Sequence, residues 1–129
     1  MRAIKFRGQD EDGKWLYGDL RQRMGYWPAI IESYCTDEGK VGYREIAVKE
    51  DTVGQFTSLR DKNGRDIYEG DILKVGCEKA KIEVRFVRGV FAFLWDGNLD
   101  DEFPCNAPTQ EWAEIIGNIH DNPRLIRRK

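Results

Sequence analysis

The sequence predicts an all-β or mostly β fold, a small barrel or sandwich of about eight short antiparallel strands. Three observations predict it: turn-forming residues recur about every 8–15 positions, several segments alternate apolar with polar residues, and no amphipathic helix exceeds about two turns. A length of 129 residues is typical of one domain. We therefore expect a single domain over residues 1–129, with at most a short helix or helical turn.

The chain opens with a predicted hairpin over residues 4–20. Apolar and polar residues alternate on both arms, and the turn at residues 10–14 contains Gly13, which is free to adopt positive φ. A strand follows in which Pro28 marks the start or an edge, and then a loop over residues 36–42. The strand with Pro28 spans residues 26–34, and further strands are expected at residues 46–48, 53–59, 71–75, 82–86, 91–95 and 115–119.

Residues 81–95 have the clearest strand pattern. Ile82, Val84 and Phe86 point to one face, and Arg88-Gly89 marks a reversal before the next alternating run. Residues 96–110 are acidic and then rich in Pro and Asn, which indicates an exposed loop. The composition of residues 111–116 allows a helical turn, but the apolar run around Gly117 favours a strand.

The overall charge excludes a dedicated DNA-coating protein. Basic and acidic side chains number 21 and 23, which leaves a net charge of −2, whereas such proteins are usually strongly basic. The three cysteines form no CxxC pair and His120 is the only histidine, so zinc-finger spacing is absent. No apolar run approaches the roughly 20 residues of a membrane span. We expect reduced thiols and a cytoplasmic location.

The stretch "DKNGRDIYEGD", residues 61–71, allows three interpretations. As an EF-hand loop starting at Asp61, it has oxygen ligands at the first and third positions. It has Arg65 at the fifth, Asp66 where Gly is required and Ile72 where Glu is required, so calcium is disfavoured. As a catalytic pair, Glu69 and Asp71 lack apolar surroundings, and we expect them to be solvated and ionised.

The third interpretation is a turn. Asn63-Gly64 is the strongest local signal for a tight reversal, and Gly70 supplies a second bend. The carboxylates of Asp61 and Asp71 are then available to accept hydrogen bonds from free backbone amides. This interpretation accounts for every residue type in the stretch without a ligand.

Three separated phrases resemble the YopX family, small proteins carried mainly by bacteriophages, prophages and other mobile elements. They are "MRAIKFR" at the N-terminus, "QFTSLRDKNGRDIYEGDI" in the centre and "IGNIHDNPRL" near the C-terminus. Ser58 stands where the family usually has Gly. If that position requires positive φ, serine costs about 1 kcal/mol there.

The resemblance implies a mostly β fold in the cytoplasm of a bacterial host, and it implies no catalytic residue, cofactor or metal. The motif residues are expected to be structural: Gln55, Phe56, Thr57, Asp61, Asn63, Gly64, Ile67, Tyr68, Glu69, Gly70, Asp71, Gly117, Asn118, Asn122 and Pro123.

The preferred functional hypothesis is a non-catalytic module that binds a phage or host macromolecule or assembles with itself. Aromatic residues near predicted loops and strand ends are the candidate contact surface: Tyr26, Trp27, Tyr34, Tyr43, Trp95 and Trp112. The alternative, that most of them pack in the core, stays open at this point.

Two other hypotheses come from different classes. A barrel that binds single-stranded nucleic acid would use aromatic stacking and the cations Arg2, Lys5, Arg7, Arg21, Arg23 and the basic tail, residues 124–129. An enzyme would need a base such as His120 beside a thiol, of which the candidates are Cys35, Cys77 and Cys105. We expect no enzyme, because no nucleophile, base and orienting group are recognisable together.

Overall fold

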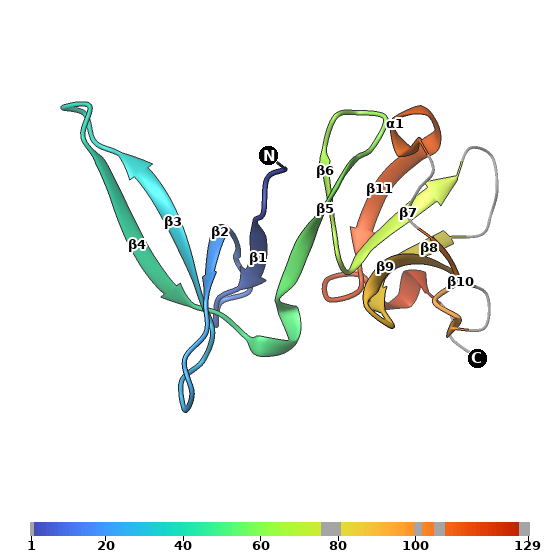
Figure 1. Cartoon of the computed structure of the whole chain (residues 1–129), viewed down its shortest axis with the longest axis horizontal. Coiled ribbons are helices and arrows are strands. Elements are labelled where there is room, and N and C mark those ends of the chain that lie inside the picture. The colour runs from blue at the N-terminus through green and yellow to red at the C-terminus, as the bar shows by residue number, and fades with distance from the viewer. Residues whose placement is uncertain (1, 76–80, 100–101, 105–107, 127–129) are drawn as a thin grey trace. The chain divides into compact units, whose positions relative to one another are not determined.

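The computed structural model describes residues 2–75, 81–99, 102–104 and 108–126. The chain divides into two compact units, Met1–Phe56 and Thr57–Lys129 (Figure 1). Each unit is considered by itself below.

The first unit is an antiparallel sheet in which neighbouring strands follow the order β4-β3-β2-β1-β5. Strand β5 begins in this unit and continues into the second. The elements are β1 (Phe6–Gln9), β2 (Trp15–Arg21), β3 (Ala29–Cys35), β4 (Val41–Ala47), the 3-10 turn η1 (Glu50–Thr52) and β5 (Gly54–Arg60).

Its small core consists of Leu16, Ile30 and Val48, each at most 2% exposed. The predicted first hairpin forms because Asp10 accepts hydrogen bonds from the backbone amides of Asp12 and Lys14, both at 2.9 Å. Gly18 on β2 approaches β3 so closely that a Cβ would lie 2.1 Å from the carbonyl oxygen of Ile31. Only glycine fits this contact.

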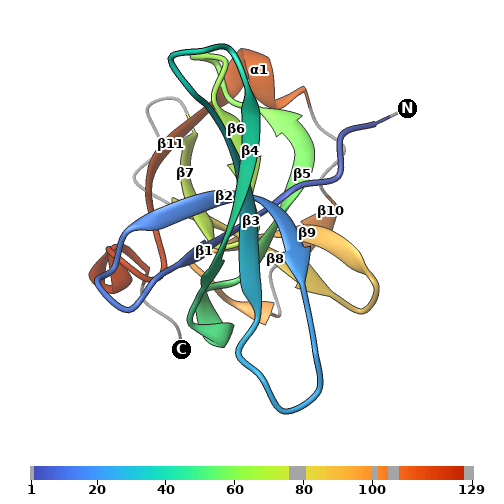
Figure 2. The ribbon, with the colours of Figure 1, turned by 90° about the vertical axis from the view of Figure 1, so that its left-hand side faces the viewer.

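Strands β3 and β4 extend beyond their neighbour β2. The β2–β3 pairing covers only Asp19 to Arg21 on β2, whereas β3 and β4 pair along all seven residues. The two views show the β3–β4 tip at one end of this ribbon and the β2–β3 loop at the other (Figures 1 and 2). The outer part of the ribbon is therefore two-stranded, and most of its side chains are exposed.

The second unit contains a five-stranded antiparallel sheet with the order β10-β9-β8-β7-β11. The end of β5 pairs with the short strand β6. The elements after β5 are β6 (Asp66–Tyr68), β7 (Asp71–Val75), β8 (Lys81–Val87), β9 (Val90–Trp95), β10 (Glu102–Pro104), α1 (Thr109–Trp112), β11 (Ala113–Asn118) and the 3-10 turn η3 (Pro123–Leu125).

The core of the second unit comes mainly from the alternating residues of the predicted β8–β9 hairpin and from β7. Its buried members include Leu73, Val84 and Phe93, all 0% exposed. Trp95 and Trp112 pack against this cluster. Phe93 and Trp112 meet edge to face, with ring centroids 5.7 Å apart. The reversal at Arg88-Gly89 forms as predicted, with positive φ at both residues.

The mostly β prediction is confirmed, and the short helix is α1. Among the described residues the strands form an open six-stranded and an open five-stranded sheet, so no closed barrel forms and the open sheets fit the sandwich alternative. The expected number of strands was too low, and the predicted loop over residues 96–110 contains β10. Strands β6 and β10 have three residues each, too few to show an alternating pattern.

The prediction of a single domain stays a prediction. Within the described part of the chain, no helix has the length and apolar character needed to cross a membrane.

Ser58 has a φ of 73°, in the left-handed region that glycine favours. The condition stated for this position, a positive φ, therefore holds, and serine is strained here. We expect Ser58→Gly to stabilise the protein by roughly 0.5–1 kcal/mol, because relief of the strain exceeds the added chain entropy. Urea unfolding at neutral pH measures the change.

Ser33→Gly is the matched control, because Ser33 lies in the extended strand β3. There the same substitution removes no strain, so it should destabilise by about 0.5–1 kcal/mol. Equal effects of the two substitutions would contradict the assignment of strain to Ser58.

Candidate functional site

The acid-rich stretch forms a tight turn around the Asp61 carboxylate. Its Oδ1 accepts hydrogen bonds from the backbone amides of Asn63 at 3.0 Å and Arg65 at 2.9 Å. The backbone closes the turn with bonds from the Asp61 amide to the Arg65 carbonyl and from Gly64 to the Asp61 carbonyl. Gly64 has a φ of 80°, which explains the glycine after Asn63.

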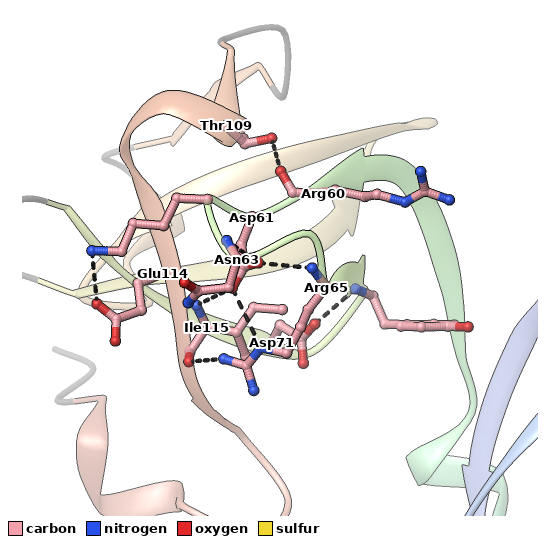
Figure 3. Close-up of polar contacts among 10 residues, drawn as sticks. Arg60, Asp61, Asn63, Arg65, Asp71, Thr109, Glu114 and Ile115 are labelled. Atoms are coloured by element: carbon pink, nitrogen blue, oxygen red, sulfur yellow. Dashed lines mark hydrogen bonds and ion pairs between the residues drawn. The ribbon is translucent and has the colours of Figure 1, made fainter.

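The same turn covers the outer edge of β11 (Figure 3). The second carboxylate oxygen of Asp61 accepts the amide of Ile115 at 3.1 Å, and the Lys62 amide donates to the Ala113 carbonyl at 2.9 Å. The Arg65 guanidinium donates to the Ile115 carbonyl. The turn therefore satisfies backbone groups that an edge strand would otherwise leave open.

Two further contacts reinforce this attachment. The Lys62 ammonium lies 3.1 Å from the Glu114 carboxylate on β11. The Thr109 hydroxyl of α1 donates to the Arg60 carbonyl at 2.7 Å. Together they attach the beginning of the turn to the α1–β11 segment.

The expectation that Glu69 and Asp71 are solvated is wrong for Asp71, which is 2% exposed, and Asp61 is also buried, at 1% exposed. Burial raises the pKa of Asp61, but the backbone amides of Ile115, Arg65 and Asn63 and the Arg65 charge lower it. The net pKa lies below the ordinary value, so the carboxylate stays ionised. The expectation that Asp61 and Asp71 accept backbone amides is confirmed, because Asp71 binds the amide of Tyr68 at 2.8 Å.

The second bend, at Gly70, connects three elements. Gly70 has a φ of 94°, donates its amide to the Val84 carbonyl at 2.7 Å and accepts the Ile119 amide at 2.9 Å. Ile67 and Tyr68, just before it, are buried. Glu69 is half-buried, so the Glu69–Asp71 pair combines a deeply buried acid with a more accessible one.

The other motif residues also hold backbone in place. Gln55 pairs with Phe6 in the sheet, and the Phe56 amide donates to the Lys5 carbonyl. The Thr57 hydroxyl donates to the Ile67 carbonyl at 2.8 Å.

The C-terminal phrase forms a turn after β11. The Asn118 side chain accepts the amides of His120 and Asp121, both at 2.9 Å, and Asn122 accepts the Asn118 amide. A Cβ on Gly117 would lie 2.4 Å from the Asn122 side-chain oxygen, so a larger residue would have to displace the side chain that accepts the Asn118 amide. Pro123 begins η3.

The candidate catalytic residues are only partly described. His120 is half-buried in the turn after β11, and Cys35 is an exposed thiol at the end of β3. Cys77 and Cys105 lie outside the described residues, as do residues 127–129 of the basic tail. In the described ranges, no three His, Cys, Asp or Glu side chains are grouped so that they could hold a metal ion.

The six predicted contact aromatics occupy two environments. In the first unit Tyr26, Trp27, Tyr34 and Tyr43 have exposed fractions of 69%, 62%, 40% and 71%. Trp95 and Trp112 pack on the core of the second unit instead. The core alternative therefore holds for Trp95 and Trp112, whereas the other four side chains are exposed and a contact surface there stays a prediction.

Two of the exposed aromatics lie at a groove of about 1310 Å³ in the first unit. The β2–β3 loop supplies Met24, Tyr26 and Trp27, and Met24 is 99% exposed. The Arg23 guanidinium lies 4.9 Å from the centre of the Tyr26 ring, at cation–π distance. The loop thus presents three large apolar side chains beside a cation.

The opposite wall is the segment 49–53, which includes η1. It is attached to β1, because the Lys49 amide donates to the Gln9 carbonyl at 2.8 Å and the Thr52 hydroxyl accepts the Gln9 amide at 2.9 Å. Its charged members are Lys49, Glu50 and Asp51. With Arg23, the groove is lined by two cations and two anions.

Sequence reasoning missed Met24 and this charged wall. Met24 follows directly on Arg23 and precedes a Gly-Tyr-Trp-Pro sequence, so a run of large apolar residues inside a turn segment was the available signal. Segment 49–53 carries no such signal, because it lies beside the loop only after the sheet has formed. The fully buried Glu83, which bonds Arg85 at 2.9 Å, also went unnoticed.

The family model described as YopX protein matches residues 5–127. The chain therefore belongs to the YopX family. Among solved structures, it is similar to the crystal structure of protein EF1440 from Enterococcus faecalis, at 25% identity and a TM-score of 0.60. The similarity covers 98% of this chain and 100% of that one. None of the curated proteins matches this chain.

We expect Asp61→Asn to destabilise the protein by about 1–3 kcal/mol at neutral pH, because an amide group would face the Ile115 amide, donor against donor. The lowered pKa sets the sign of the pH dependence. The contribution of the carboxylate is complete above the unfolded pKa near 3.8 and is lost as pH falls through the folded value. The difference between the urea midpoints of the two proteins should therefore be smaller at about pH 2.5 than at about pH 7.

Glu114→Gln is the control, because it removes a more exposed carboxylate from the same attachment. Exposed ion pairs contribute at most about 1 kcal/mol. A constant difference between wild type and Asp61→Asn at both pH values would contradict the role assigned to the ionised Asp61.

Proposed function

We propose that this chain is a non-catalytic binding module that holds a segment of another protein in the groove between the β2–β3 loop and residues 49–53. The carrying observation is the cluster of Met24, Tyr26 and Trp27, all largely exposed beside one concave surface. Tyr and Trp dominate the binding energy of many protein interfaces, and Met adapts to irregular partners.

The charges of the groove support a polypeptide as the partner. Its four charged residues, Arg23, Lys49, Glu50 and Asp51, cancel. A phosphate backbone would meet two carboxylates there, whereas a peptide with an apolar anchor flanked by charges of both signs is complementary. The attachment of segment 49–53 to β1 favours a preformed wall, which lowers the cost of binding.

Two cations of the nucleic-acid hypothesis, Arg7 and Arg21, are engaged within the first unit. Arg7 is 5% exposed with its guanidinium 4.5 Å from the Trp15 ring centre. Arg21 forms an ion pair with Glu45 at 2.6 Å. These contacts weigh against a continuous basic groove. Nucleic-acid binding would appear as a rise in anisotropy with labelled oligonucleotides.

The family resemblance directs the search for the natural partner to phage and bacterial host proteins in the cytoplasm. That setting is part of the proposal. A non-catalytic role is proposed as well, because the sequence offers no recognisable nucleophile, base and orienting group together.

The test is a selection from a randomised peptide library with the full chain as bait. We expect peptides with an aromatic or large aliphatic residue next to charged residues, with micromolar affinity by calorimetry. Trp27→Ala and Tyr26→Ala should each weaken binding about tenfold or more, because they remove anchoring side chains. Labelled oligothymidine and oligouridine should give flat anisotropy titrations at low salt.

Phe86→Ala is the control, because Phe86 is a 50% exposed aromatic on β8, outside the groove. It should bind the selected peptides as the wild type does. Peptides that bind Trp27→Ala and wild type equally, or oligonucleotide binding that depends on Trp27, would overturn the proposal.

A further inference from the structure

The end strands β11 and β4 of the two sheets differ in how their outer edges are covered. The outer edge of β11 is covered by the Asp61–Arg65 turn. Strand β4 ends the order of the other sheet, and none of the hydrogen bonds among the described residues reaches its outer side. A seven-residue edge of this kind is a template for pairing with another strand.

The pairing of β4 with β3 determines which backbone groups point outward. The Val48 amide donates to the Pro28 carbonyl, and the Thr36 amide donates to the Lys40 carbonyl, so even-numbered β4 residues bond toward β3. Antiparallel ladders alternate such pairs. The amides and carbonyls of the odd-numbered residues, from Val41 to Ala47, therefore point to the open edge.

The side chains do little to block this edge. Strand β4 contains neither Lys nor Pro, residues that commonly protect edges. Its two charges are engaged within the sheet, Arg44 with Glu32 at 3.4 Å and Glu45 with Arg21 at 2.6 Å. Val41 and Tyr43 are 64% and 71% exposed.

We propose that β4 pairs with β4 of a second copy of this chain, antiparallel about a two-fold axis at Tyr43. A two-fold axis perpendicular to the sheet puts one residue opposite its own copy. An axis centred on Arg44 or Glu45 would place that residue opposite its own copy, with like charges facing each other. An axis centred on Gly42 would place Lys40 opposite Arg44 of the other copy, again two like charges. Centring the axis on Val41 or beyond Glu45 would carry the pairing past Val41 or past Ala47, the two ends of β4.

Only the register centred on Tyr43 avoids these conflicts. It places the two Tyr43 side chains next to each other and Val41 opposite Glu45 of the other copy. Val41, Tyr43 and Glu45 of both copies then exchange their outward amides and carbonyls. The exposed tyrosine becomes a cross-strand aromatic pair, a favourable arrangement between antiparallel strands.

The pairing involves one short strand from each copy, so the interface is at the small end of specific interfaces and the dimer is weak. We expect a dissociation constant between about 10 µM and about 1 mM. This contact is separate from the groove, since β4 contributes none of the residues that line the groove.

Sedimentation equilibrium of the full chain at about 10 µM to about 1 mM tests the proposal, with charge-swapped variants. Tyr43→Lys and Tyr43→Glu should each be monomeric, because each opposes like charges across the axis. An equimolar mixture should regain the dimer as a Lys–Glu pair. Phe86→Lys, which adds the same charge at an exposed aromatic on β8, should dimerise as the wild type does.

Thermal unfolding verifies that both Tyr43 variants fold. A wild-type chain that is monomeric throughout this range would overturn the proposal and leave the edge to a strand from a different protein. Variants that dimerise like the wild type, or a mixture no better than its components, would overturn the Tyr43-centred register and with it the proposed contact.

Discussion

The structure of the second unit depends on one buried charge, the Asp61 carboxylate. It accepts two amides of its own turn and the amide of Ile115, which lies 54 positions further along the chain. Burying a carboxylate is unfavourable unless hydrogen bonds compensate, and here three backbone donors and Arg65 do so. The turn that reverses the chain after β5 is thereby attached to the final strand of the sheet. A single side chain joins local turn geometry to tertiary structure.

The motif that defines the family is, in this chain, a set of such attachments. Asp71 holds the Tyr68 amide, Thr57 holds the Ile67 carbonyl, and Asn118 and Asn122 close the turn after β11. Each contact gives a backbone group a side-chain partner, and that stabilises turns and short strands. Because the motif residues build the scaffold, the recognition that we propose falls to positions outside the motif.

Those positions lie in the first unit, which keeps large apolar side chains in contact with solvent. The β2–β3 loop and the outer half of the β3–β4 ribbon have few buried neighbours, because the core there ends with Leu16, Ile30 and Val48. Exposed aromatic residues and an open strand edge are unfavourable unless something binds them. The two units therefore differ in character: the edge strand β11 is covered, whereas the first unit exposes large aromatic side chains and an open strand edge.

The sequence by itself determined the strand-rich class, the hairpins at residues 4–20 and 81–95 and the turn at Asn63-Gly64. All of these depend on residues close together in the chain, where alternation and φ preference act directly. It did not reveal that Asp61 and Asp71 are buried, that β6 and β10 are strands, or that segment 49–53 faces the β2–β3 loop. Tertiary structure decided these, because burial, edge coverage and groove walls arise from segments that are distant in sequence and meet only in the folded chain.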